Sequence, residues 1–315
     1  MAQEYDKFPE GSRTRPASGQ GSDPHYDYKN DVLKNKHNIP DPDVLDIVLN
    51  RRSRKRIQEL ESKPLEGNYD QAHFQNFHKY IFKDTFDWAG EIRHINIEKS
   101  QDVLANESVD TVQYSDTQKI SEQLTKHLTE INSIDYKRPA SEVIEDLAKP
   151  MAALWKTHAF REGNTRTTLA YVTQITREKG LDLDPVVLAA NTAVSKEDKI
   201  DNIVKYNKET INIRDALVLA AAKSNYEPLK KIINAAHDVA KGALKDATKH
   251  LARYKVTLQS EKYLAARGYS DTAKSLVKEQ LKQHKIDGQQ YKNIKAEISK
   301  ISNKSKSKSS DLEIG

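Results

Sequence analysis

Residues 157–168 read Thr-His-Ala-Phe-Arg-Glu-Gly-Asn-Thr-Arg-Thr-Thr, and this stretch decides how the rest of the chain is interpreted. Apolar residues recur at helical spacing over residues 141–157, directly before it. A second helical pattern runs out of it over about 166–179. The stretch is therefore a loop that leads into a helix N-terminus, where free backbone N–H groups and the helix dipole favour an anion.

This loop concentrates side chains that handle phosphate groups. His158 can accept a proton near neutral pH, Glu162 offers the hard oxygen that Mg²⁺ prefers, and Arg166 carries a fixed positive charge. Gly163 and Asn164 add a flexible backbone point and a small amide that suit an anion nest. Taken singly, Glu162 is also a common helix-start acid and Arg166 a common surface cation. The ordered set predicts phosphate chemistry.

The stretch resembles the signature of the Fic family, His-x-Phe-x-(Asp/Glu)-Gly-Asn-Gly-Arg-x-x-Arg. The matching positions are His158, Phe160, Glu162, Gly163, Asn164 and Arg166. Thr165 stands where the second motif Gly is usual, and Leu169 stands where the second Arg is usual. Residues 69–97 resemble the helix and β-hairpin flap of the family, so that the resemblance covers roughly residues 25–240.

The resemblance implies a mostly α fold, a Fic-type helical bundle with a small β-hairpin flap, plus a C-terminal basic helical extension. It also implies a protein adenylyltransferase, which uses Mg²⁺ and transfers AMP from ATP to a Ser, Thr or Tyr hydroxyl of a target protein. In that chemistry His158 would be the general base and Glu162 the Mg²⁺ ligand. The nucleotide-binding residues would be Gly163, Asn164, Thr165 and Arg166.

Residues 93–99 take the position of the flap. Ile95 and Ile97 alternate with polar residues after the helix-breaking Trp88-Ala-Gly90, which predicts a short strand. By resemblance, the target-docking residues are Arg93, His94, Ile95, Asn96, Ile97, Glu98 and Lys99. A strand of this kind holds an extended target segment through backbone hydrogen bonds, with little demand on the target's sequence.

The two departures from the signature bear on activity and on regulation. Thr165 adds a β-branched side chain, so that either the loop shifts or the hydroxyl itself contacts phosphate. In the family the second Arg meets the γ-phosphate or pairs with an inhibitory Glu, and Leu169 can do neither. Glu66, in the weak inhibitory-like pattern Ser62–Gly67, thus lacks its usual mate. We expect that a separate small antitoxin protein controls the activity, or that there is no such control. We also consider that the chain modifies itself.

Other functions remain open beside AMP transfer. A degenerate Fic scaffold would bind a nucleotide or a partner without transfer, and a Fic enzyme with another nucleotide would transfer a different group. Arg51–Arg56 is a run of positive charge that fits a solvated helix face. A nucleic-acid or acidic-partner patch is the alternative, but no aromatic residues interleave with the run, so we do not expect nucleic acid as a partner.

Charge divides the chain into two regions. Residues 241–315 carry 17 Lys and Arg against 8 Asp and Glu, which leaves 34 basic and 38 acidic residues before them. We therefore expect a disordered arm at 1–24, a Fic domain at 25–240, a basic helical extension at 241–300 and a disordered tail at 301–315.

The composition also restricts the class of protein. The chain has no Cys, which excludes a disulfide framework and a Cys-ligated metal site. No apolar run approaches the roughly 18–20 residues that span a bilayer, so we expect no membrane span. We expect a cytoplasmic protein, or a toxin or effector exported by a secretion system that reads a C-terminal signal.

Overall fold

The computed structural model describes residues 15–16, 22–104, 111–189, 205–206, 209–210 and 212–240. These residues all belong to the first of the two units of the chain, Met1–Ala243. The predicted basic extension at 241–300 and the predicted tail at 301–315 lie outside the described residues, as does most of the predicted arm at 1–24.

The motif loop joins two helices, α4 (Ala140–Thr157) and α5 (Asn164–Glu178). α4 presents one buried apolar stripe, which consists of Val143, Leu147, Met151, Leu154 and Trp155. Pro150 lies inside α4, where proline typically costs about 3 kcal/mol. The helix continues through it because each buried side chain of the stripe contributes about 1.5–3 kcal/mol.

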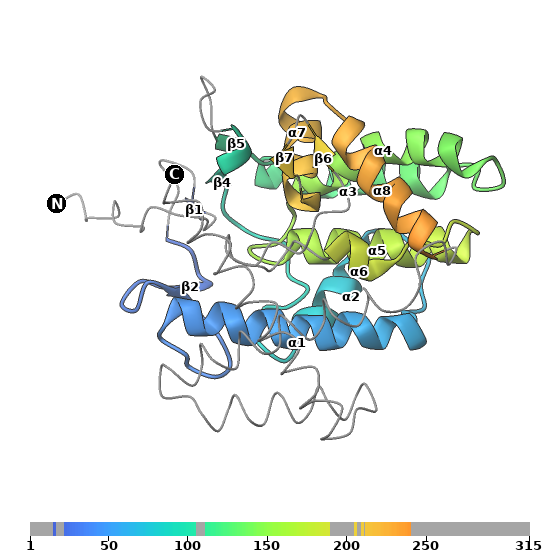
Figure 1. Cartoon of the computed structure of the whole chain (residues 1–315). Helices are drawn as coiled ribbons and strands as arrows, with labels where there is room; N and C mark the ends of the chain where they lie inside the picture. Colours follow the sequence, from blue (N-terminus) through green and yellow to red (C-terminus); the bar gives the residue numbers. More distant parts are fainter. Residues whose placement is uncertain are drawn as a thin grey trace, which may run out of the picture. The chain divides into compact units, whose positions relative to one another are not determined.

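The remaining helices cover this pair from both sides, as Figure 1 shows. They are α1 (Pro42–Ser62), α2 (Gln71–Phe82), α3 (Ile120–Asn132), α6 (Pro185–Ala189), α7 (Ile213–Lys223) and α8 (Glu227–Ala240). α1 and α2 pack on each other and on α5, whereas α3, α7 and α8 pack on α4. Two short 3₁₀ turns, Asp102–Leu104 and Thr117–Lys119, flank the sheet region. The structure thus confirms the expected mostly α bundle.

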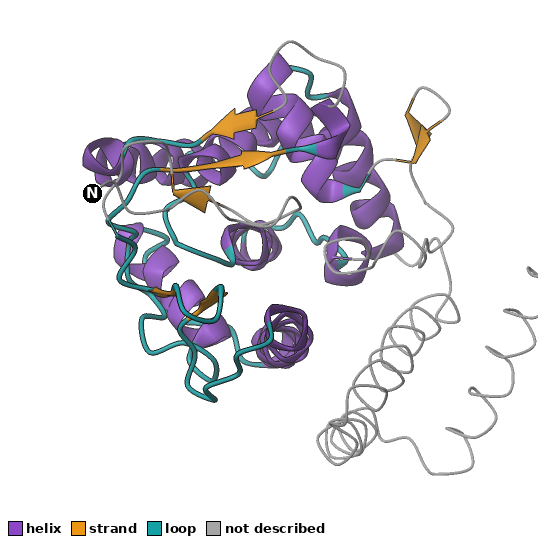
Figure 2. Cartoon of the chain, turned by 90° about the vertical axis from the view of Figure 1, so that its left-hand side faces the viewer, coloured by secondary structure: helices purple, strands orange, loops and turns teal. Residues whose placement is uncertain are grey.

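The strands are short and antiparallel. They are β1 (Arg15–Pro16), β2 (Tyr26–Asp27), β3 (Val32–Leu33), β4 (Ile97–Ser100), β5 (Thr111–Gln113), β6 (Lys205–Tyr206) and β7 (Glu209–Thr210). β4 lies at the centre of a three-stranded sheet in the order β1-β4-β5, where Glu98 is opposite Gln113 on one side and Arg15 on the other. Figure 2 shows these strands beside the helices. The small β element expected in the flap region is therefore present.

The N-terminal arm differs in part from the expectation of disorder over residues 1–24. Its residues Arg15 and Pro16 pair with β4. Asp23 is only 2% exposed and forms an ion pair with Arg161 of the motif loop. Both contacts join residues far apart in the sequence, which is why local composition did not indicate them.

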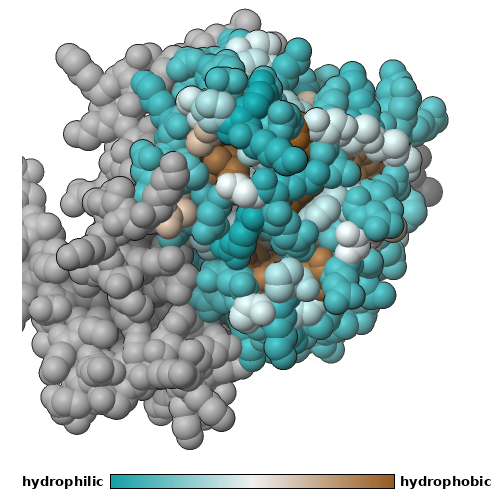
Figure 3. Space-filling model, turned by 90° about the vertical axis from the view of Figure 1, so that its right-hand side faces the viewer, coloured by the Kyte–Doolittle hydropathy of each residue, from teal (hydrophilic) through white to brown (hydrophobic). Residues whose placement is uncertain are grey.

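The surface is strongly polar. In Figure 3 the face shown is largely hydrophilic, and apolar side chains are visible mainly in hollows between the helices. Among the described helices, none combines the length and apolar composition that a membrane crossing requires.

Candidate active site

Two residues in the left-handed conformation shape the loop between α4 and α5. His158 ends α4 with φ 47° and ψ 56°, and Gly163 precedes α5 with φ 84° and ψ 8°. A Cβ atom on Gly163 would lie 2.2 Å from Cζ of Phe82, so no larger residue fits there without displacement. A non-glycine residue in this conformation costs roughly 1–2 kcal/mol. Strain of this kind often marks a functional position.

The His158 side chain is buried in an aromatic surround. Its ring stacks on Tyr114 with a centroid distance of 3.6 Å, and it meets the Trp155 ring edge-on at 5.5 Å. Its Nδ1 atom lies 3.3 Å from the Trp155 carbonyl oxygen, which can only accept. Nδ1 therefore carries the proton and Nε2 keeps its lone pair. Burial lowers the pKa of His158 well below its usual value, and nearby cations, Arg93 first, lower it further.

Arg93 fixes the peptide of His158 from the flap region. Its Nε donates to the His158 carbonyl at 2.8 Å, and its backbone N–H donates to the Ala159 carbonyl at 2.9 Å. The other guanidinium nitrogens donate to the carbonyls of Ile95, at 2.6 Å, and Ser115. Arg93 is only 2% exposed, so its side chain holds the loop and is not accessible to a target.

Three further side chains, those of Asn164, Phe160 and His78, hold the loop in place. The Asn164 side chain accepts from the Phe160 backbone N–H at 2.9 Å and donates to the Phe160 carbonyl at 2.7 Å. Phe160 is fully buried and stacks on His78 at 3.9 Å. His78 donates from Nε2 to the Glu162 carbonyl at 2.9 Å and accepts the Gly90 N–H at 2.7 Å. The amide predicted to face phosphate thus bonds to the loop backbone in this structure.

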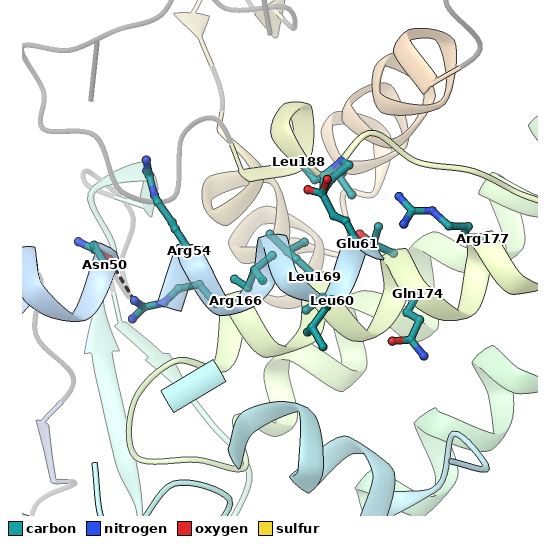
Figure 4. Close-up of a pocket in the computed structure, with 13 residues that line it drawn as sticks. Asn50, Arg54, Leu60, Glu61, Arg166, Leu169, Gln174, Arg177 and Leu188 are labelled. Atoms are coloured by element: carbon teal, nitrogen blue, oxygen red, sulfur yellow. Dashed lines mark hydrogen bonds between the residues drawn. The ribbon is translucent and has the colours of Figure 1, made fainter. Parts of the chain in front are cut away.

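Glu162 and Arg166 form an ion pair one helical turn apart. Arg166 Nη2 donates to Glu162 Oε1 at 3.0 Å, and the Gly163 N–H donates to the same oxygen at 2.8 Å. Arg166 Nη1 donates to Asn50 Oδ1 at 3.0 Å, seen in Figure 4, and to Ser53 Oγ at 2.9 Å. Burial alone would raise the pKa of Glu162, but the neighbouring cations, Arg166 first, lower it below its usual value. The carboxylate is therefore charged.

One cavity of about 100 Å³ brings the predicted catalytic, metal and nucleotide residues together. These are His158, Glu162, Gly163, Asn164, Thr165 and Arg166. The cavity is also lined by Lys99, Tyr114, Trp155 and Arg214. Lys99 alone of the predicted flap residues reaches it. The other three were not predicted as site residues, and only Trp155 lies near the motif in sequence.

Two cations from outside the signature face this cavity. Arg214 lies in the first turn of α7, and its Nη2 donates to Gln101 Oε1 at 3.0 Å. Burial lowers the pKa of Lys99 to about 8, and the Arg214 charge acts in the same direction. Arg214 lies two residues after the helix cap Asn212, and no motif in the sequence marks it as a site residue.

The two departures from the signature occupy different surroundings. The Thr165 hydroxyl accepts from Trp155 Nε1 at 2.9 Å and lines the cavity. Leu169 is 6% exposed and lines a separate groove beside α1 and α6. The signature usually has a positively charged Arg at this position. Here the apolar side chain of Leu169 takes its place, on the groove side of α5.

Most side chains of the predicted flap serve the fold. Arg93, Ile95 and Ile97 are buried, and Asn96 accepts from the Thr117 N–H at 2.9 Å. His94 is exposed and Glu98 is half-buried. Any docking by this segment would therefore rely on backbone groups of β4.

The donors at Glu162 fit a Mg²⁺ ion. The carboxylate is charged, and among the described residues Oε1 accepts two hydrogen bonds while Oε2 accepts none. Mg²⁺ typically takes one or two carboxylate oxygens together with substrate phosphates and water. The carboxylate therefore has an oxygen available for such an ion.

Residues 68–175 match the model of the Fic/DOC family. The chain is 29% identical over 166 residues to protein adenylyltransferase VbhT of Bartonella schoenbuchensis, which covers 52% of this chain and 32% of VbhT. It is 29% identical over 161 residues to the probable protein adenylyltransferase y4lH of Sinorhizobium fredii, covering 49% of this chain and 74% of that protein. This chain thus spans about a third of the length of VbhT.

Solved structures share the fold. The BepC effector protein of Bartonella tribocorum, with bound AMPPNP, has a TM-score of 0.52 at 20% identity and covers 67% of this chain and 95% of its own. An ADP-bound Fic domain of a Bep effector from Bartonella quintana has a TM-score of 0.52 at 21% identity, covering 67% of this chain and 93% of that one.

Proposed function

Residues 68–175 of this chain form a domain of the Fic/DOC family, and from this premise we propose that the protein is an adenylyltransferase that transfers AMP from ATP to a hydroxyl side chain of a target protein. The observation that carries the proposal is the cavity itself. It joins a neutral imidazole, a charged carboxylate and three cations, which are His158, Glu162, Lys99, Arg166 and Arg214. These are the groups that nucleotidyl transfer requires.

His158 is the general base of the proposed reaction. Its Nε2 lone pair takes the proton of the acceptor hydroxyl as the hydroxyl oxygen attacks the α-phosphorus of ATP. The new bond joins that oxygen to the α-phosphorus, and the bond from the α-phosphorus to the bridging oxygen breaks, so that pyrophosphate leaves. Because Nδ1 is held on the Trp155 carbonyl, the tautomer that accepts at Nε2 is already set.

The cations of the cavity would balance the phosphate charge. Arg166 and the uncapped N-terminus of α5 come from the signature itself. Lys99 and Arg214 are additional, and we propose that they supply the charge that Leu169 does not. Glu162 would hold Mg²⁺ through its free oxygen. When bound, that ion supplies Lewis-acid stabilisation of the developing negative charge on the phosphates.

The target segment would lie along β4 by backbone pairing. In this structure the β4 edge that does not meet β5 is paired with Arg15 and Pro16 of the chain itself. A target would therefore have to displace β1, or extend the pairing beyond its two residues.

A second hollow is the proposed place of a small antitoxin protein. It lies between α1, α5 and α6, with Leu60, Leu169 and Leu188 among its lining residues and Arg54 and Arg177 also part of it (Figure 4). Arg166 is shared by this groove and the catalytic cavity. A partner helix seated there would thus touch a nucleotide-binding residue. Mixing the chain with such a partner and finding unchanged ATP affinity would argue against this form of control.

The site of action also belongs to the proposal. Since ATP is the donor, we propose that the chain works in a cytoplasm, either that of the producing cell or that of a cell into which it is exported. Fractionation of the producing culture, with the secreted fraction tested separately, distinguishes the two.

The decisive test uses ATP labelled in turn at the α-phosphate and the γ-phosphate, with Mg²⁺ and cell lysate. We expect protein labelling from the α-label only, and none in the His158→Ala variant. Labelling from the γ-label would instead indicate phosphate transfer. If calorimetry shows that ATP binds while no protein becomes labelled, the degenerate scaffold is favoured. The Glu162–Arg166 ion pair is compatible with that alternative as well.

Self-modification is tested in the same experiment without lysate. A mass increase equal to one AMP on the purified chain, absent in His158→Ala, is the expected result. An unmodified chain that still labels lysate proteins would restrict the activity to targets in trans.

A further inference from the structure

Three side chains that can ligate a metal, from two separate segments of the chain, meet at the base of the flap. They are His25, Glu91 and His94, and their ligand atoms all lie within 4.8 Å of one another. His25 Nε2 lies 3.9 Å from Glu91 Oε2, and the two imidazole centroids are 6.4 Å apart. Among the described residues this is the one group of three or more such side chains, and it shares none of its members with the nucleotide cavity.

We infer that His25, Glu91 and His94 form a binding site for a transition-metal ion of the Zn²⁺ class. Two imidazole nitrogens with one carboxylate suit Zn²⁺, with a fourth position left for water. Mg²⁺ prefers oxygen ligands alone, so the ion of this site differs from the one proposed for Glu162. In a tetrahedral site the ligand atoms are about 3.3 Å apart, compared with 3.9 Å between His25 Nε2 and Glu91 Oε2 and at most 4.8 Å for any pair of the three side chains.

His25 is the preorganised member of the three. Its backbone N–H donates to Asp23 Oδ1 at 2.9 Å, and Lys34 donates to its carbonyl at 2.8 Å. Its ring lies against Trp88 at 4.9 Å, and its side chain is 13% exposed.

The other two ligands can adjust to an ion. Glu91 is 56% exposed and follows Gly90 in a turn closed by its N–H on the Trp88 carbonyl at 3.0 Å. His94 is exposed, but the backbone on both sides of it is fixed by Arg93, which bonds Ala159 and Ile95. Because both side chains are exposed, they can rotate toward His25 when an ion binds.

An ion at this place would tie two segments together. One is the N-terminal stretch that carries Asp23, and the other is the loop that carries Arg93. Since both of these residues hold the motif loop, through Arg161 and His158 respectively, the ion would stiffen the frame around the catalytic cavity without entering it.

The test is calorimetry and thermal melting of the full chain, free of any polyhistidine tag and stripped of metal. We expect one saturable Zn²⁺ site and a rise in melting temperature of about 5–10 °C when free Zn²⁺ is about a hundredfold above its Kd. Mg²⁺ at the same concentration should give no such rise. His94→Ala should weaken Zn²⁺ binding at least about tenfold, and Glu91→Gln should weaken it with little change of shape.

The matched control is His127→Ala. His127 is also paired with a carboxylate, Glu130 at 3.0 Å, but no second histidine of the described part of the chain joins them. This variant should bind Zn²⁺ like the parent chain. The proposal is overturned if His94→Ala and Glu91→Gln keep the parent's affinity, or if His127→Ala loses as much. His94 and Glu91 are exposed, so the metal-free melting temperature of each variant shows whether a loss reflects binding and not unfolding.

Discussion

The motif loop at 157–168 and the flap strand β4 border the same cavity, yet they are built in opposite ways. In the loop, side chains from other elements hold the backbone: Arg93 bonds the His158 carbonyl and His78 bonds the Glu162 carbonyl. In the flap, backbone pairs with backbone along β4, over two or three residues on each side. The hydrogen bonds therefore hold the loop in one conformation, whereas the edge of β4 can pair with another segment in place of β1.

In the proposed transferase, this difference would let one site combine exact chemistry with a tolerant choice of target. Misplacing a reacting group by about 1 Å can cost roughly a hundredfold in rate. Backbone pairing with a target carries little sequence information by contrast. The two regions should thus respond very differently to substitution.

Gly163→Ala should have the largest effect, because it breaks the loop. The added Cβ would lie 2.2 Å from Phe82 at a φ of 84°, and we expect a loss of about 2–4 kcal/mol in unfolding free energy, together with loss of transfer. Urea unfolding and α-labelled ATP measure the two effects. Gly180→Ala is the control: its φ is 103°, but no atom lies within 4 Å of the new Cβ. It should cost about 1 kcal/mol. Equal losses would contradict this account of the loop.

Arg93→Lys should weaken the link between the two regions. Lysine keeps the charge but cannot reach the carbonyls of His158, Ile95 and Ser115 together. We expect a loss of about 1–2 kcal/mol in stability and about a tenfold lower kcat. Arg52→Lys on α1, which bonds only the Asp84 carbonyl through its described contacts, is the comparison for stability. An unchanged kcat in Arg93→Lys would show that the flap does not position His158.

The pH dependence of kcat/KM should report the charge of Lys99. The pKa of Lys99 in the free protein is lowered to about 8, so the ammonium is present below that pH and is lost as pH rises through it. The kcat/KM for ATP should therefore fall above about pH 8. Lys99→Met should raise KM for ATP about tenfold and flatten this fall. A profile of the same shape in the variant would exclude Lys99 as the titrating group.

Deletion of residues 1–21 should have the smallest effect, because among the described residues it changes only the flap edge. It removes the two residues that pair with β4 and keeps Asp23. Because one or two backbone hydrogen bonds are worth about 1 kcal/mol, we expect a KM for a protein target about two- to fivefold lower, at constant kcat. Deletion of residues 1–14 retains β1 and should leave KM near the full-length value. If both truncations behave alike, β1 does not compete with the target.

The sequence predicts well what is local. The helices on both sides of the motif follow from apolar periodicity, and Gly163 and His158 fall where the signature requires a break. The buried role of Phe160 was also predictable, because a large aromatic residue inside a polar loop has to find the core.

Contacts between distant segments were beyond prediction. The ion pair of Asp23 with Arg161 joins residues 138 apart, and Arg214 reaches the cavity from α7. Tyr114, which stacks on His158, lies on a segment with no motif of its own. Such contacts depend on how helices and strands pack together, and the apolar periodicity within one segment does not indicate that packing.

The left-handed backbone at His158 has a consequence for evolution. Glycine and asparagine adopt this conformation at a lower cost than histidine, so a replacement by either would relieve strain. Relatives that have lost the chemistry are therefore expected to drift toward Gly or Asn at this position, and to gain stability as they do. A survey of Fic sequences for that exchange would give a simple marker of inactive lineages, independent of any assay.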